Sequence, residues 1–129
     1  MFYLDTSAAV NLVVVEKGIA ALRRWLATRE QRIFSSDLLC AELLRATQRA
    51  APEQMAQARA VLDSLILVTL STAVCDRAAI FEPGLLRSLD ALHLAAALEI
   101  GDELEAVVTY DRRMTEGSQA LGIDVVAPM

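Results

Sequence analysis

The sequence has few of the residues that form zinc sites or disulfide frameworks. It contains two cysteines and one histidine among 129 residues, and it has no Cys-x-x-Cys pair. Cys40 and Cys75 are far apart in the chain, and two isolated cysteines rarely form a disulfide in a cytosolic protein. We therefore expect both thiols to be buried and unreactive, and we expect no zinc site.

The sequence also lacks an uncharged apolar run of the roughly 18 residues that a membrane-spanning helix needs. Its most apolar stretch, residues 89–100, carries Asp90, His93 and Glu99. The first residues, Met-Phe-Tyr-Leu-Asp, have no basic segment of the kind that opens a secretory signal. We therefore expect a cytoplasmic protein that does not associate with membranes.

Basic residues are fewer than acidic ones, which is unusual for a protein that binds nucleic acid. Seventeen acidic residues against 12 basic ones give a formal net charge of −5, whereas a nucleic-acid-binding surface is usually basic. The basic residues are clustered at 23–32, 45–49 and 112–113, and eleven of the 12 are arginine. Arginine can bind phosphate through two hydrogen bonds. An arginine excess can equally reflect a GC-rich genome, so this pattern leaves phosphate binding open.

The length and a hydrophobic content of 55 % predict one globular domain over residues 1–129. Short apolar runs predict strands at residues 1–4, 32–35, 65–70, 106–110 and 124–126. Helical periodicity and capping residues predict helices at about 8–15, 19–28, 37–50, 52–64, 72–82, 88–100 and 111–122, with Ser88 as one cap and Gly101 as a stop. Alternating strands and helices indicate an α/β fold with a mainly parallel central sheet of about five strands, flanked by helices.

Two acidic residues directly follow predicted strands. Asp5 comes after the first strand and Asp111 after the fourth, so both belong at the carboxyl edge of the sheet, where such folds build their sites. Each also has a simpler explanation, since an aspartate between a strand and a helix is an ordinary helix N-cap. The position of either residue alone does not decide between these interpretations.

Two further acidic residues lie within apolar helical segments. Asp90 is surrounded by leucine and alanine, where an ionised carboxylate is costly unless it is paired or bound to a metal. Asp90 can instead lie in the first turn of a helix, where the helix dipole favours negative charge. Glu42 is the only acid between residues 38 and 51, and a surface ion pair with Arg45 is its simpler explanation.

Four segments of the sequence together resemble the PIN-domain family, and within it the VapC-type toxins of prokaryotic toxin–antitoxin pairs. The segments are Tyr-Leu-Asp-Thr-Ser-Ala at 3–8, Ala-Glu-Leu-Leu-Arg at 41–45, Leu-Arg-Ser-Leu-Asp-Ala-Leu-His-Leu-Ala-Ala-Ala at 86–97, and Val-Thr-Tyr-Asp-Arg-Arg-Met at 108–114. Leu-Gly-Ile at 121–123 and a terminal Ala-Pro follow. The resemblance covers nearly the whole chain, in order and with matching spacing.

The resemblance implies a set of site residues. The acidic positions that hold metal in the family correspond to Asp5, Glu42, Asp90 and Asp111. Thr6 and Thr109 correspond to polar neighbours that often support the site. Some family members carry a further acid or amide shortly after the last aspartate, whereas Arg112, Arg113, Met114 and Thr115 follow it in this sequence. That departure weakens the case for a strong second metal site.

The residue types favour one kind of chemistry. Carboxylates without a Cys or His cluster are ligands for Mg²⁺ or Mn²⁺, which can activate water and offset charge on a phosphodiester under attack. We therefore expect a metal-dependent endoribonuclease, with Asp5 and Asp90 as direct ligands and Glu42 and Asp111 acting partly through water. We expect His93 to be a hydrogen-bonded structural residue.

Other functions fit the sequence less well. An aspartyl-phosphate enzyme needs a second acid two residues after the first, and Ser7 stands there; a dinucleotide-binding protein needs a glycine-rich turn where Asp5-Thr6-Ser7 stands. A non-catalytic PIN-like module that binds RNA or protein remains the main alternative. The resemblance further implies an RNA substrate, a cognate antitoxin and a homodimer. The many leucines and alanines at 38–50 and 52–64 predict an exposed apolar patch on those helices.

Overall fold

The protein is built around one parallel β-sheet. The computed structural model describes residues 1–14, 19–29, 32–82, 84 and 86–129. Within these residues, five strands pair in the order β3-β2-β1-β4-β5, and each pair is parallel. The strands are β1 (Phe2–Leu4), β2 (Ile33–Ser36), β3 (Ile66–Val68), β4 (Ala106–Val108) and β5 (Val125–Val126). The strand order changes direction at β1, which has β2 on one side and β4 on the other.

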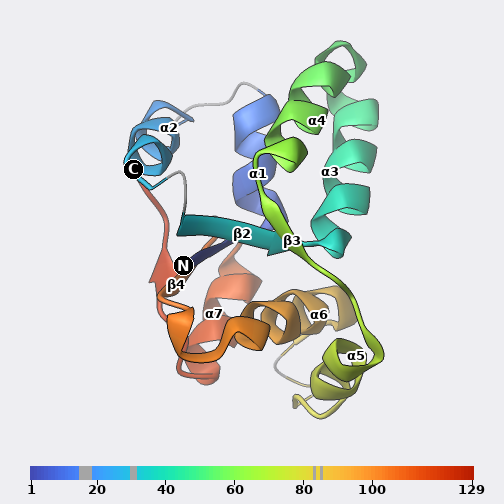
Figure 1. Cartoon of the computed structure of the whole chain (residues 1–129), viewed down its shortest axis with the longest axis vertical. Coiled ribbons are helices and arrows are strands. Elements are labelled where there is room, and N and C mark those ends of the chain that lie inside the picture. Colours follow the sequence, from blue (N-terminus) through green and yellow to red (C-terminus); the bar gives the residue numbers. More distant parts are fainter. Residues whose placement is uncertain (15–18, 30–31, 83, 85) are drawn as a thin grey trace.

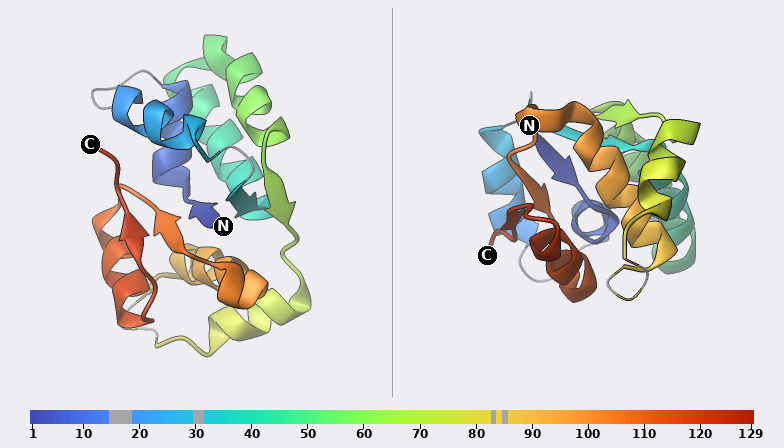
Figure 2. Two further views of the ribbon diagram at one scale, coloured as in Figure 1. Left: turned by 60° about the vertical axis from the view of Figure 1, so that its left-hand side comes forward. Right: turned by 90° about the horizontal axis from the view of Figure 1, so that it is seen from below.

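Helices cover both faces of the sheet (Figure 1). On one face lie α1 (Thr6–Val13), α2 (Ile19–Ala27), α3 (Asp37–Ala50) and α4 (Met55–Asp63); on the other lie α5 (Thr72–Ala79), α6 (Ser88–Ala97) and α7 (Arg112–Ala120). The turned views in Figure 2 show the same two layers with the sheet between them. No helix in the described ranges is both long and apolar enough to cross a membrane.

The alternation of side chains along β1 separates two hydrophobic cores. Tyr3 belongs to the cluster that contains Leu94 of α6 and Met114 of α7, whereas Leu4 belongs to the cluster that contains Leu39 and Leu43 of α3. Neighbouring residues of a strand point to opposite faces of the sheet, so one strand contributes to both cores. Helix α6 has four buried alanines, at positions 91, 95, 96 and 97. Their small side chains allow the helix to lie close to the sheet.

The predicted α/β class and five-stranded parallel sheet are confirmed, and the differences concern element ends. The predicted helix 52–64 begins as a 3₁₀ turn, Pro52–Gln54, before α4. The predicted helix 88–100 ends at Ala97 and continues as a 3₁₀ helix, Leu98–Glu103. Ser88 is not its cap, because Arg87 occupies the N-cap position. The predicted helix 8–15 starts two residues earlier, and its last residue falls outside the described ranges.

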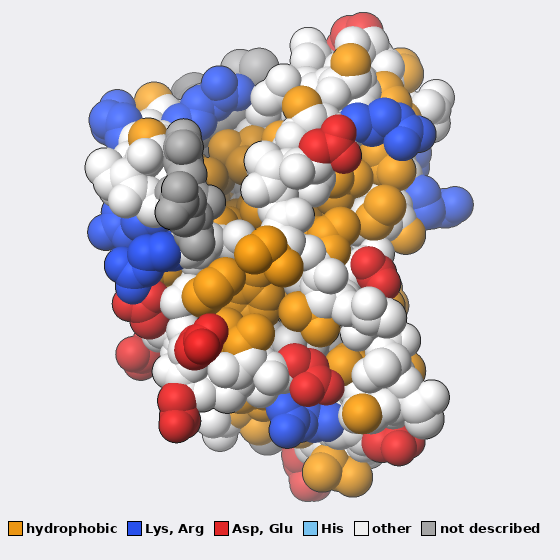
Figure 3. Space-filling view, viewed as in Figure 1, with side chains coloured by type: hydrophobic (Ala, Val, Ile, Leu, Met, Phe, Trp, Pro, Cys, Tyr) orange, Lys and Arg blue, Asp and Glu red, His pale blue; other side chains and the backbone are white. Residues whose placement is uncertain are grey.

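Two expectations about the surface are wrong. Cys40 and Cys75 are free thiols, but Cys75 is exposed and Cys40 only partly buried. The expected apolar patch on α3 and α4 is also absent from the described residues, since the large exposed apolar side chains are Ile66, Ile80, Leu89 and Met129. On the face shown in Figure 3, apolar side chains gather near the centre, and basic ones lie over α2 and beside α3 and α4.

Candidate active site

The candidate site lies where the strand order changes direction. β1 and β4 are adjacent and parallel, so the residues that follow them leave the sheet at the same edge. The Asp5 backbone N–H donates to the Val108 carbonyl at 3.1 Å, which extends the pairing to the last residue before the α1 helix. Ligand sites in open α/β sheets form at such a position. The topology therefore places Asp5 and Thr109 side by side.

The Asp5 carboxylate is buried and held by two hydroxyl groups. Its exposed fraction is 3 %, and its Oδ2 accepts hydrogen bonds from Thr109 Oγ1 at 2.7 Å and Ser7 Oγ at 2.9 Å. Asp5 occupies the N-cap position of α1, yet its side chain makes no capping hydrogen bond. The N-cap explanation is therefore wrong for Asp5. Within the described residues, its second oxygen, Oδ1, accepts no hydrogen bond.

Ser7 connects these groups to the backbone and was not anticipated from the sequence. Its Oγ lies 3.1 Å from Thr109 Oγ1 and accepts the Tyr110 backbone N–H at 2.9 Å. Thr109 Oγ1 in turn accepts the Asp111 backbone N–H at 3.1 Å. The two hydroxyls are thus themselves fixed by backbone donors, which holds the Asp5 carboxylate in one orientation.

Glu42 projects from α3 toward the same edge of the sheet. Its Oε1 accepts hydrogen bonds from Thr6 Oγ1 at 2.7 Å and His93 Nε2 at 2.5 Å. Burial alone would raise the pKa of the Glu42 carboxyl, but these two hydrogen bonds outweigh burial and hold its pKa below the ordinary value. The explanation by a surface pair with Arg45 is wrong, because Glu42 bonds to Thr6 and His93. No described residue bonds to its Oε2.

His93 belongs to this group of residues, whereas the sequence predicted only a hydrogen-bonded structural role for it. The ring is buried and, as expected, hydrogen-bonded, at both of its nitrogens. Its Nε2 also lies 3.8 Å from Asp5 Oδ1, so the imidazole stands between the two carboxylates. Its position three residues after Asp90, on an alanine-rich helix, was the available signal. That spacing alone did not identify its partners, because they depend on α6 packing beside β2.

Asp90 and Asp111 complete the acidic edge in different ways. Asp90 lies in the first turn of α6, and burial, followed by the negative charges of Asp111 and Asp5, raises its pKa. Asp111 caps α7, since its Oδ1 accepts the backbone N–H groups of Arg113 at 2.7 Å and Met114 at 3.2 Å. The N-cap explanation is therefore correct for this oxygen of Asp111. Because Asp5 and Asp111 both raise the pKa of Asp90, the three aspartates lie close enough to interact electrostatically.

The acidic groups are not arranged as a preformed metal cluster. Among the residues that the structure describes, no three His, Cys, Asp or Glu side chains are grouped as ligands of one ion. Asp5 and Glu42 each have one oxygen fixed by hydrogen bonds and one that accepts no hydrogen bond from the described residues, and such a donor set suits a hard cation.

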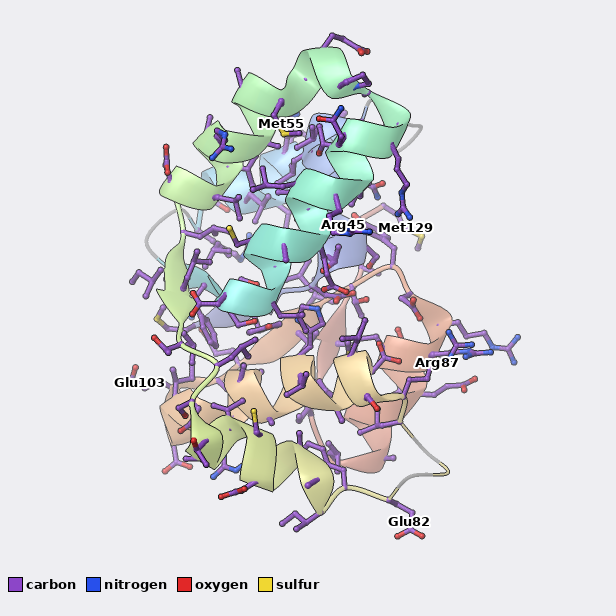
Figure 4. The ribbon with its side chains drawn as sticks, turned by 90° about the vertical axis from the view of Figure 1, so that its right-hand side faces the viewer. Arg45, Met55, Glu82, Arg87, Glu103 and Met129 are labelled. Atoms are coloured by element: carbon purple, nitrogen blue, oxygen red, sulfur yellow. The ribbon has the colours of Figure 1, made fainter. Side chains whose placement is uncertain are left out.

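Two arginines border the acidic edge. Arg45 extends from α3 and Arg87 from the start of α6, on the side of the molecule that Figure 4 shows. The positive charge of Arg87 partly offsets the repulsion that raises the pKa of Asp90. These side chains supply positive charge beside a strongly acidic region.

A separate apolar cavity of about 600 Å³ lies between α1, α2 and α4. Leu4, Leu12, Leu26 and Val61 are among its lining residues, and none of the four acidic residues lines it. The polar groups of the candidate site lie at the sheet edge, outside this cavity.

Comparison with known proteins agrees with this arrangement. A family model described as PIN domain matches residues 2–118. The chain is 39 % identical over 132 residues to "Ribonuclease VapC47" and 42 % identical over 126 residues to "Ribonuclease VapC46", both from Mycobacterium tuberculosis. These matches cover 99 % and 98 % of this chain and 97 % and 96 % of the relatives.

A solved structure has the same fold. The crystal structure of Mycobacterium tuberculosis VapC20, a Sarcin-Ricin loop cleaving toxin, superimposes with a TM-score of 0.77. The match covers 99 % of this chain and all of that one, at 15 % sequence identity. At that identity the likeness concerns the fold.

Proposed function

The chain belongs to the PIN-domain family, and from this premise we propose that it is a Mg²⁺- or Mn²⁺-dependent endoribonuclease, the toxin of a toxin–antitoxin pair. Relatives that are 39 % and 42 % identical over almost the whole chain are named ribonucleases, which supports the nuclease activity. The structural observation that carries the proposal is the shared pattern at Asp5 and Glu42. Each has one oxygen held by protein donors and one oxygen left for another ligand.

The donor set fits a hard divalent cation. Asp5 and Asp90 would hold it directly, and Glu42 and Asp111 partly through water. Such a cation, when bound, lowers the pKa of a bound water and offsets charge that develops on the phosphate. Thr6 and Thr109 support the set by fixing Glu42 Oε1 and Asp5 Oδ2.

The protein's own residues would align the reactants for in-line attack. The Oε2 of Glu42 would accept a hydrogen bond from the attacking water and orient it toward phosphorus. The water oxygen forms the new P–O bond and releases a proton to solvent, the bond from phosphorus to the 3′ oxygen breaks, and that oxygen takes up a proton from solvent. The products then carry a 5′-phosphate and a 3′-hydroxyl. Arg45 and Arg87, at the border of the site, are placed to bind the flanking backbone phosphates.

An acidic site of this kind also suits inhibition by a basic side chain. We expect an antitoxin to place an arginine or lysine among the carboxylates, where charge-assisted hydrogen bonds would replace the cation. We also propose that the protein forms a homodimer. Light scattering at micromolar concentration tests the dimer, and a monomer alone would contradict it.

The nuclease activity is tested with purified protein and a mixture of cellular RNAs, in Mg²⁺, Mn²⁺ or excess EDTA. We expect cleavage only with metal, and sequencing of the new 5′ ends should show 5′-phosphates. Asp90→Asn should abolish cleavage, whereas Asp37→Asn, which changes an exposed first-turn acid of α3, should not. Strong cleavage in EDTA would contradict the metal requirement. The absence of cleavage under all conditions would favour the non-catalytic PIN-like binding module.

A further inference from the structure

A chain of buried hydrogen bonds runs from β2 to the carboxylate of Glu42. Ser36 Oγ lies 2.8 Å from Tyr3 OH, and Tyr3 OH lies 2.6 Å from His93 Nδ1. His93 Nε2 then lies 2.5 Å from Glu42 Oε1. This series of hydrogen bonds, which we call the Ser36–His93 chain, joins the adjacent strands β1 and β2 to the helices α6 and α3 through side chains alone.

The polar side chains of the Ser36–His93 chain are buried, which costs free energy unless they are hydrogen-bonded. Ser36 and Tyr3 have an exposed fraction of 0 % and His93 of 2 %, and buried polar groups contribute to stability only if all their hydrogen bonds are made. Ser36 stands at the N-cap position of α3, but its side chain makes no capping bond and bonds to Tyr3 instead. The local helix start thus forgoes an ordinary stabilising contact in favour of the Ser36–His93 chain.

The acceptor at the end of the chain fixes the direction of the hydrogen bonds. The Glu42 carboxylate can only accept, so His93 Nε2 carries a proton and donates it. In the neutral imidazole, which carries a single ring proton, His93 Nδ1 is then the acceptor of the Tyr3 O–H, and the Tyr3 oxygen accepts the O–H of Ser36. Burial raises the pKa of the Tyr3 phenol, so this group keeps the proton that it donates. Every hydrogen bond in the chain is satisfied in this arrangement.

We propose that His93 is a positioning residue for Glu42, and that Tyr3 and Ser36 keep its ring proton on Nε2. His93 and Thr6 together hold Oε1, which turns Oε2 toward the reaction centre. The contact of 3.8 Å between His93 Nε2 and Asp5 Oδ1 places the ring so that it also sets the spacing of the two carboxylates. This inference rests on the proposed nuclease function for its consequence in catalysis, but the proton arrangement does not depend on that function.

The proton arrangement is tested by NMR, because His93 is the only histidine in the chain. Long-range ¹H–¹⁵N correlations will therefore contain one imidazole ring, whose two nitrogens report their own protonation. We expect Nε2 to carry the proton and Nδ1 to be bare, and we expect Tyr3→Phe to shift the proton partly to Nδ1. Tyr110→Phe is the matched control, since it removes a hydroxyl bonded to Pro128 instead. A proton on Nδ1 in wild type, or no change in Tyr3→Phe, would overturn the proposal.

The positioning role is tested by replacing His93 in two ways. Gln keeps an N–H donor near the place of Nε2, whereas Leu keeps the bulk and loses the donor. We expect His93→Leu to lower kcat about 10- to 100-fold with little change in KM, as for other residues that orient a site carboxylate, and we expect His93→Gln to recover most of the rate. Tyr3→Phe, which removes one oxygen, should give a smaller loss and serves if His93→Leu does not fold.

The outcomes separate this inference from the proposed function. If wild type cleaves RNA and folded His93→Leu and Tyr3→Phe proteins cleave at the same rate, His93 does not position Glu42. If Gln and Leu reduce kcat equally, the N–H donor is not what matters, and the proposal is again overturned. If wild type shows no cleavage, the proposed function fails, and the NMR result alone decides the arrangement of protons.

Discussion

Replacing the hydroxyl of Thr109 by a methyl group tests whether the site is held together by hydrogen bonds to the Asp5 carboxylate. Thr109 is fully buried, and its Oγ1 donates to Asp5 Oδ2 at 2.7 Å and accepts the Asp111 backbone N–H at 3.1 Å. Thr109→Val keeps the shape and removes both bonds. A hydrogen bond to a charged group contributes about 1.5–3 kcal/mol. We therefore expect Thr109→Val to lower the free energy of unfolding by about 2–3 kcal/mol.

Thr47 offers a matched control for the same substitution. It is also buried, in the middle of α3, but its Oγ1 donates only to the neutral carbonyl of Leu43, at 2.8 Å. A neutral bond contributes about 1 kcal/mol. In a chain of this length, those values correspond to a fall in Tm of roughly 10 °C for Thr109→Val and about 4 °C for Thr47→Val.

Urea unfolding of both variants and of wild type, with equal slopes against urea, measures the difference directly. RNA cleavage measured beside it should fall for Thr109→Val and not for Thr47→Val, because only the former releases the Asp5 carboxylate. Equal destabilisation by the two substitutions would refute the reasoning. In that case the hydroxyl of Thr109 would count as an ordinary buried hydrogen bond, without a role in fixing Asp5.

Two other substitutions test different parts of the structure. Because the pKa of Asp90 is raised by burial, Asp111 and Asp5, its folded pKa lies above its unfolded one, and its ionisation costs stability at neutral pH. Metal-free Asp90→Asn should therefore be at least as stable as wild type near pH 7, with a gain in unfolding free energy of at most about 1 kcal/mol after solvent screening. This gain should shrink as the pH falls through the raised pKa of Asp90. A clear loss of stability at pH 7 in thermal melts would contradict this prediction. Gly117→Ala tests the packing of α7, because a Cβ at this position would overlap with Leu86 Cδ2. Overpacking should cost about 1–3 kcal/mol unless Leu86 moves, and a gain in chemical denaturation would contradict the close packing of Leu86 on Gly117.

The local sequence accounts for the elements and for two of the four acidic positions at the sheet edge. Apolar runs closed by Asp5 and by Asp111 mark strand ends, and parallel strands in one sheet deliver such residues to one edge whatever the details of packing. Two helix ends were also local: Ser71 caps α5 through Val74, and Gly122, with a φ of 75°, follows α7. These features depend on a few neighbouring residues, and for that reason they could be predicted.

What each polar group does depends on the tertiary structure. Asp5 and Asp111 both occupy the N-cap position of a helix, yet only the Asp111 side chain makes capping hydrogen bonds. The Asp5 carboxylate instead accepts hydrogen bonds from Thr109 and Ser7. Glu42 and His93 are 51 residues apart and meet only because α3 and α6 pack beside the same strand from opposite faces of the sheet. Hydrogen bonds between distant side chains depend on the relative placement of whole elements. That placement is set by the summed burial of both cores, which no short segment of the sequence contains.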